Sequence, residues 1–155
     1  MKADTEAVRA YLDGGMSAKH VFADENHRTP LMILFFSTQA CPAKPEAARA
    51  TAKVLLEHGA DVNQVDEQKN TALMFAANNC DRQTLRMLLK AGAKLNARNW
   101  SNLTVLELSI VTGNPGIEEL IEAGARLDPE KAKSFAEAYK NNPRALALIK
   151  KASAK

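Results

Sequence analysis

The sequence predicts an all-α fold, a solenoid of stacked helix-turn-helix units joined by β-turn fingers. Two observations predict it. An apolar run, a Gly, a polar stretch and a second apolar run recur in the same order, as "LLEHGADVNQVDEQKNTALMFAANN" (55–79) and "LLKAGAKLNARNWSNLTVLELSIVT" (88–112). Apolar residues make up 46% of the chain but aromatic residues only 5%, which favours closely packed aliphatic helices over a sheet sandwich.

The recurrence has a fixed period. Gly59 and Gly92 are 33 residues apart, and Gly124 follows 32 residues later. Thr71 and Thr104 are also 33 residues apart, whereas Thr29 precedes Thr71 by 42, which leaves room for a nine-residue insertion. A period in this range is typical of units that bury their faces only against their neighbours.

Each landmark has a physical role. A Thr hydroxyl can accept a hydrogen bond from an unpaired backbone N–H, so Thr29, Thr71 and Thr104 are expected to begin helices. The spacing of Leu85, Leu88 and Leu89 predicts a second helix in the unit. The glycines follow the last apolar pair of each unit, where a left-handed residue ends a helix.

The repeated segments resemble the ankyrin repeat. The resemblance covers about 24–128 and rests on five segments, namely "TPLM" (29–32), "TALMFAA" (71–77), "LTVLELSI" (103–110), "HGADVN" (58–63) and "AGAKLN" (91–96). The sequence departs from the family pattern where Met32, Met74 and Glu107 replace the usual His and Cys80 replaces the usual Gly. The third repeat also lacks one residue near Gly113, so its second helix is expected to start irregularly.

The chain of 155 residues is expected to be a single domain. Its expected parts are a capping half-repeat (1–23), a first full repeat (24–65) with an insertion at about 38–46, a second (66–98), a third (99–128) and a helical cap (129–155). Pro129 and the pair Asn142-Pro143 predict that the last part is a helical hairpin.

No catalytic constellation is found in the sequence. Nucleophile-elbow, phosphate-loop, H-E-x-x-H and C-x-x-C motifs are missing, and His20, His27 and His58 fall at unrelated repeat positions. We therefore predict no enzyme activity, catalytic residue, cofactor, metal site or small-molecule substrate. The "NLT" at 102–104 matches a glycosylation acceptor, but its Thr is expected to cap a helix.

The family resemblance implies that a protein partner lies along the concave side, on finger tips and first helices. Transferred to this chain, that surface comprises Glu25, Asn26, Arg28, Phe36, Ser37, Glu67, Gln68, Asn70, Asn78, Asn79, Trp100, Ser101, Leu103, Val111 and Thr112. Trp100, the single Trp, is expected to be a hot spot, and the alternative is that it covers the neighbouring finger. Phe36 is expected either to bind or to be buried by the insertion.

The insertion "TQACPAKPE" (38–46) has two interpretations. Its prolines would stiffen a binding loop, yet surface loops of this length are also tolerated without a function. Cys41 lies in it, and Cys80 lies in the equivalent turn one repeat along. Both are expected to be free thiols, or to form a disulfide if the protein resides in an oxidising compartment.

Three functions are weighed. The leading hypothesis is a non-catalytic module that is monomeric when free and binds one protein partner, as an inhibitor, an immunity protein to a bacterial toxin or an adaptor. The alternative is docking of nucleic acid or an anionic membrane to the last 26 residues, which carry a net charge of +5. An unrecognised enzyme site in the groove is the third. No apolar run is long enough to span a membrane, and no signal peptide is seen, so a cytoplasmic location is expected, or a periplasmic or exported one if a signal was removed.

Overall fold

The computed structural model describes residues 5–22, 26–36, 45–78, 81–114 and 116–154 of the chain. Nine helices lie within these ranges, which are α1 (Thr5–Asp13), α2 (Pro30–Phe35), α3 (Pro45–Glu57), α4 (Ala72–Ala77), α5 (Arg82–Lys90), α6 (Val105–Thr112), α7 (Ile117–Glu122), α8 (Pro129–Ala138) and α9 (Pro143–Ser153). The described residues contain no strand, only an isolated bridge between Val65 and Thr71. The all-α class predicted from the sequence is confirmed.

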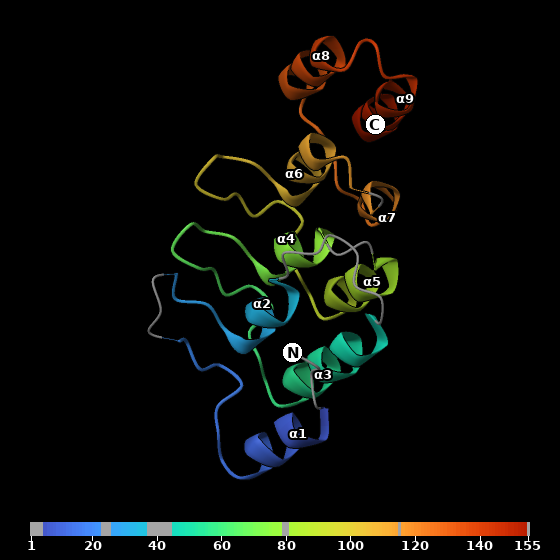
Figure 1. Cartoon of the computed structure of the whole chain (residues 1–155). Coiled ribbons are helices and arrows are strands. Elements are labelled where there is room, and N and C mark those ends of the chain that lie inside the picture. The colour runs from blue at the N-terminus through green and yellow to red at the C-terminus, as the bar shows by residue number, and fades with distance from the viewer. Residues whose placement is uncertain (1–4, 23–25, 37–44, 79–80, 115, 155) are drawn as a thin grey trace.

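The helices form two parallel layers with loops projecting from one side (Figure 1). The inner layer contains α2, α4 and α6, and the outer layer contains α3, α5 and α7, with α1 packed against α3 and α9 against α7. The loops that project beside the inner layer are called here the first finger (26–29), the second finger (65–71) and the third finger (98–104). The fingers and the inner helices therefore bound one face of the stack, which is the face expected to be concave and is called here the concave face.

The inner helices begin where the sequence predicts. Thr29, Thr71 and Thr104 have extended backbones, and each hydroxyl accepts a hydrogen bond from the backbone N–H three residues on, at 3.3, 3.4 and 3.3 Å respectively. All three threonines are buried, so loss of a hydroxyl would leave a backbone N–H with little access to water. Removing one such cap typically costs about 1 kcal/mol.

The outer helices end at glycines, also as predicted. Gly59, Gly92 and Gly124 have φ values of +81°, +88° and +100°, a region that residues with a side chain adopt only with strain. In each case the next residue donates its N–H to a carbonyl of the last helical turn, as Ala60 does to Leu55 at 3.0 Å. The outer helices of all three units thus end in the same kind of turn.

The core is aliphatic and repeats with the chain. Leu31, Leu73 and Leu106 occupy the same position of successive inner helices, and each is 0% exposed. The corresponding leucines of the outer layer are buried as well, namely Leu55, Leu88 and Leu120. All six leucines belong to one cluster of buried residues that runs through the units, which is why the units are stable only as a stack.

The third unit is irregular, as the missing residue predicts. Gly113 ends α6 with φ +70°, and α7 begins after Gly116 without a side-chain cap. Instead, the buried Asn114 side chain accepts the N–H of Gly116 at 2.7 Å. A Cβ atom at Gly116 would lie 2.4 Å from Cδ1 of the buried Leu85, so this glycine allows α7 to approach α5 closely.

Candidate functional site

Each of the second and third fingers is held by an Asp or Asn at its base. Asp66 is buried and accepts the backbone N–H of Asn70 at 2.7 Å. Asn99 does the same for Leu103 at 3.1 Å. Lys69 and Asn102 take up the positive φ that these tight turns need, at 59° and 58°. The fingers are therefore defined loops whose tips have fixed conformations.

Neighbouring fingers are also bonded to each other. The N–H of Glu67 donates to the carbonyl of Asn26 at 3.0 Å, and the N–H of Trp100 donates to the carbonyl of Gln68 at 2.9 Å. The Asn99 amide adds a side-chain bond to Asn70 at 3.2 Å. Because every tip is tied to the one before it, the tips form a row of fixed spacing along the concave face.

Trp100 lies at the tip of the third finger. Its backbone is bonded to the second finger, yet the residue is 75% exposed, more than any other large apolar residue described. The indole ring therefore does not cover the neighbouring finger. An exposed Trp on a fixed backbone can bury a large area against a partner at little cost in conformational entropy.

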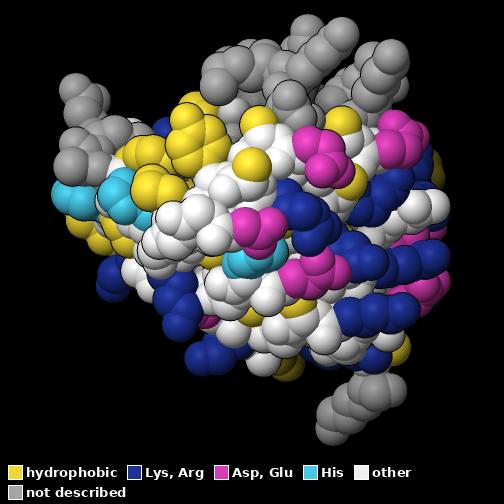
Figure 2. Space-filling model, turned by 90° about the horizontal axis from the view of Figure 1, so that it is seen from below, with side chains coloured by type: hydrophobic (Ala, Val, Ile, Leu, Met, Phe, Trp, Pro, Cys, Tyr) yellow, Lys and Arg dark blue, Asp and Glu magenta, His cyan; other side chains and the backbone are white. Residues whose placement is uncertain are grey.

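Apolar side chains continue from the fingers onto the inner helices. Ile33 and Phe36 on or beside α2 are exposed, as is Val111 on α6. Phe36, Asn78 and Val111 are equivalent positions of successive units, so the apolar row is interrupted by one amide. Figure 2 shows hydrophobic side chains gathered at the upper left, the side on which the fingers project.

Arg28 organises the first part of this face. Its guanidinium carbon lies 3.7 Å from the centroid of the Phe36 ring and 5.6 Å from that of Phe75. The two rings meet edge to face at 5.7 Å, and Arg28 Nε lies 4.0 Å from a buried Asp66 oxygen. Stacking of this kind fixes the half-exposed Phe36 ring in place without removing it from the surface.

Sequence comparison agrees with this architecture. Residues 39–131 match the family of ankyrin repeats in three copies. The chain belongs to the ankyrin-repeat family. An ankyrin repeat-containing protein of Treponema pallidum (strain Nichols) is 32% identical over 111 residues, which is 71% of this chain and 34% of that protein. The chain thus spans about a third of that relative's length. Ankyrin repeats generally mediate protein–protein interaction and are typically non-catalytic.

The structure distributes the residues of the predicted ankyrin surface unevenly. Glu67, Gln68, Ser101 and Thr112 are exposed, whereas Asn26, Arg28, Asn78 and Leu103 are half-buried. Glu67 also contacts His27 of the first finger. Asn70 faces inward more than its polarity suggests, because its amide bonds Asp66 at 3.2 Å and accepts from Asn99. It therefore joins the fingers.

Part of the prediction falls on residues that the structure does not describe. These are Glu25, Ser37 and Asn79 of the predicted binding surface, the two cysteines Cys41 and Cys80, and most of the insertion. The two interpretations of the insertion and of the cysteines stay predictions.

One structural residue of the third repeat was missed. Glu107 is 1% exposed and accepts the backbone N–H of Thr104 at 3.0 Å, while Thr104 caps Glu107 in return. Arg98 adds an ion pair to Glu107 at 3.2 Å. The signal was present in the sequence, because Thr-x-x-Glu before an apolar run is the pattern of a capping box.

His58 joins α1 to α3. Its Nε2 lies 3.0 Å from a carboxylate oxygen of Asp13, and its Nδ1 lies 2.9 Å from the carbonyl of Val54. The hydrogen bond to Asp13, followed by the bond to Val54, raises the pKa of His58 above its ordinary value of 6.5. The helix-end position predicted for His58 is thus also a junction between two helices.

The described residues contain neither a cluster of metal ligands nor a membrane-spanning helix. No three His, Cys, Asp or Glu side chains among them lie close enough to hold a metal ion. Among the same residues, no helix has the length and apolar character needed to cross a bilayer.

Proposed function

We propose that the chain is a non-catalytic module that holds one protein partner on its concave face. The observation that carries the proposal is the exposed Trp100 on a finger whose backbone is bonded to the finger before it. Binding energy at interfaces concentrates in a few aromatic and Arg side chains on rigid supports, surrounded by polar residues. Trp100 has such surroundings in Gln68 and Ser101.

The rest of the contact surface is proposed from the same geometry. Phe36, stacked on Arg28, would form a second anchor at the α2 end of the face. Leu103 would supply apolar contact on the finger that carries Trp100, Val111 would do so at the far end of α6, and the interrupting Asn78 would bond a polar group of the partner. Ser37 and Asn79 complete the proposed set on the basis of the family resemblance alone.

The proposed biological role is that of an inhibitor, an immunity protein or an adaptor. A binding face made of fixed finger tips can cover a functional surface of its partner without any chemistry of its own. No residue constellation that could carry a reaction was found in the sequence, which supports a role in binding.

The test is a capture experiment from the native source, with partners identified by mass spectrometry. The purified partner is then titrated against wild type, Trp100→Ala/Phe36→Ala and Tyr11→Ala. Tyr11 is a matched control because it is 68% exposed but lies on α1, away from the fingers. We expect the double variant to bind at least about 100-fold more weakly, since each hot spot contributes about 2 kcal/mol or more.

Two results would contradict the proposal. Equal affinity of the double variant and wild type would move the binding site off the concave face. Capture of nucleic acid alone, released by moderate salt, would indicate docking to the basic residues beyond Glu130, because phosphate contacts weaken steeply with ionic strength.

A further inference from the structure

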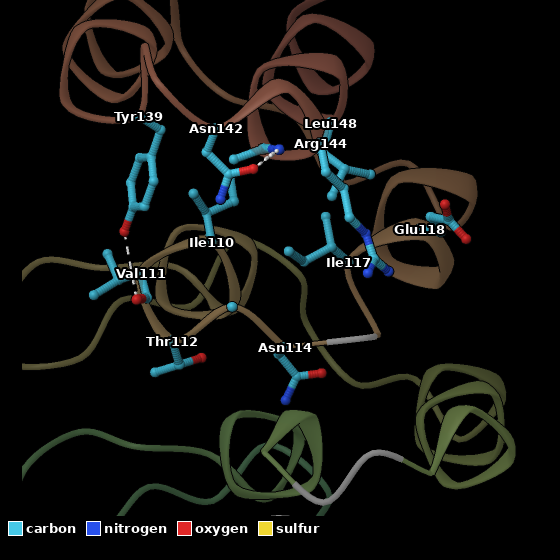
Figure 3. A pocket seen from close by; sticks show the side chains of 12 residues that line it. Ile110, Val111, Thr112, Asn114, Ile117, Glu118, Tyr139, Asn142, Arg144 and Leu148 are labelled. Atoms are coloured by element: carbon cyan, nitrogen blue, oxygen red, sulfur yellow. Dashed lines mark hydrogen bonds between the residues drawn. The ribbon is translucent and has the colours of Figure 1, made fainter.

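A cavity of about 320 Å³ lies between the third ankyrin unit and the α8–α9 hairpin (Figure 3). The end of α6 contributes Ile110 and Val111, and α7 contributes Ile117. The hairpin contributes Tyr139, Arg144 and Leu148. The cavity thus combines apolar walls with a guanidinium, at the opposite end of α6 from the third finger.

The cavity exists because the hairpin docks on the outer layer. α9 packs against α7 through the buried Ile149 and Ala152, and the carbonyl of Ala152 accepts the N–H of Leu127 at 3.1 Å. α8 packs mainly on α9 and does not continue the close contacts that join α2, α4 and α6. Space therefore remains between the end of α6 and the turn of the hairpin.

Arg144 is available for a ligand. Within the described part of the chain its side chain makes no hydrogen bond or ion pair. The acid that also lines the cavity, Glu118, pairs with Arg82 at 3.5 Å. Figure 3 shows Arg144 extending from α9 to lie beside Ile117, with the Glu118 carboxylate directed away from it. The cavity consequently presents a positive charge beside an apolar wall.

The start of α9 adds to this charge. Arg144 is the second residue of α9, and the first-turn backbone N–H groups of a helix carry a partial positive charge. The Asn142 side chain caps Ala145 at 3.1 Å, so the turn that carries Arg144 is fixed. The hydroxyl of Tyr139 reaches the carbonyl of Val111 across the cavity at 3.4 Å, a long bond that a better acceptor could replace.

We propose that this cavity binds the C-terminal residue of a partner chain, with its carboxylate on Arg144 and an apolar side chain against Ile117 and Leu148. Charge and shape select this occupant. Guanidinium groups match carboxylates in geometry, Ile117 and Leu148 offer apolar contact beside Arg144, and 320 Å³ is near the lower limit of ligand pockets, about 300 Å³. The cavity shares Val111 with the proposed concave surface but contains none of its finger residues, and the proposal goes beyond that surface.

The probe is N-acetyl-L-leucine, titrated into the ¹⁵N-labelled full chain and followed by amide chemical shifts. We expect saturable shifts at Ile110, Ile117 and Ala145. N-acetyl-L-leucinamide, which lacks the charge, and N-acetylglycine, which lacks the apolar side chain, should each bind at least about tenfold more weakly, as the loss of one charge-assisted hydrogen bond or one buried side chain predicts.

The matched variants are Arg144→Gln and Lys150→Gln. Both residues are exposed on α9, so neither change should disturb folding, but only Arg144 lines the cavity. We expect Arg144→Gln to lower the affinity for N-acetyl-L-leucine at least about tenfold and to leave the affinity for N-acetyl-L-leucinamide unchanged. Lys150→Gln should change neither affinity.

Three results would overturn the proposal. These are no saturable shift up to the solubility limit of the acid, equal affinity for acid and amide, and equal binding by wild type and Arg144→Gln. Failure of the finger-surface proposal can be distinguished from failure of this one. Partner capture that does not depend on Trp100 would contradict the finger surface but would not alter the titration with N-acetyl-L-leucine.

Discussion

The two ends of α6 meet their neighbours in different ways. At its start, Thr104 and Glu107 cap each other, and the preceding finger is bonded through Trp100 to the one before it. At its end, Gly113 turns the chain, and one long hydrogen bond from Tyr139 reaches Val111 across a cavity. The first junction is closed by bonds between like parts, and the second joins unlike parts and leaves space.

The two junctions differ in whether their arginine is engaged within the protein or is available to a ligand. Arg28, on the finger side, stacks on Phe36 beside Asp66, and it fixes the surface that the face presents. Arg144, on the hairpin side, also lies beside apolar side chains but has no acid within ion-pair distance among the described residues. An arginine of the first kind shapes a binding surface, whereas one of the second kind can bind a ligand directly.

The largest expected effect is in the first turn of α6. Leu106 is 0% exposed, so Leu106→Ala leaves a cavity and should lower the free energy of unfolding by about 3 kcal/mol. Val111→Ala, a change at an exposed residue of the same helix, should cost less than about 0.5 kcal/mol. Urea denaturation followed by circular dichroism measures both. Similar costs for the two variants would mean that α6 is not anchored by its buried face.

The next effect tests the closed junction. Glu107→Gln retains an acceptor for the Thr104 N–H but loses the ion pair with Arg98, and should destabilise by about 1–2 kcal/mol. Glu118→Gln removes a partly exposed ion pair and should cost less than about 1 kcal/mol. A cost of Glu107→Gln no greater than that of Glu118→Gln would show that the capping box alone holds this end of α6.

Much of the fold could be predicted because its signals are local. A Thr hydroxyl finds its backbone partner three residues away, and a left-handed Gly ends the helix that immediately precedes it, so Thr29, Thr71, Gly59 and Gly92 could be interpreted without any tertiary structure. The capping box of Thr104 and Glu107 is a local signal of the same kind, so the role of Glu107 could have been predicted.

The site was harder to predict because its contacts cross between units. Asn70 is a polar finger residue, yet its side chain is hydrogen-bonded to Asp66 and Asn99 and is not available to a partner. The bond to Asn99 depends on how two fingers align. The cavity depends on where α8 and α9 sit against α6 and α7. No spacing within the hairpin specifies that placement, so Arg144 could not be distinguished from the other basic residues of the segment.

A smaller effect tests the open junction. Tyr139→Phe removes the 3.4 Å bond to Val111 and should change the free energy of unfolding by less than about 0.5 kcal/mol, because so long a bond contributes little. Thermal denaturation measures the change. A cost above about 1 kcal/mol would mean that this bond holds the hairpin in place and that the junction is as closed as the finger side.

The smallest effect concerns the junction of α1 and α3. Since Asp13 raises the folded-state pKa of His58, the contact stabilises the fold fully below about pH 6.5 and the contribution is lost as pH rises through the raised value. The melting temperature of Asp13→Asn should therefore fall below that of wild type at about pH 6 and approach it at about pH 9. Glu57→Gln is the control. A difference in melting temperature between Asp13→Asn and wild type that does not change with pH would show that His58 is not its cause.

The backbone hydrogen bonds between fingers run in one direction. In both cases the later finger donates an N–H, from Glu67 or Trp100, and the earlier finger accepts with a carbonyl. The row of fingers is thus polar, with a donor side and an acceptor side, and a unit added in reverse would bring two donors or two acceptors together. A chain built this way can lengthen by head-to-tail duplication of its gene segment, but an inverted copy has no place in it.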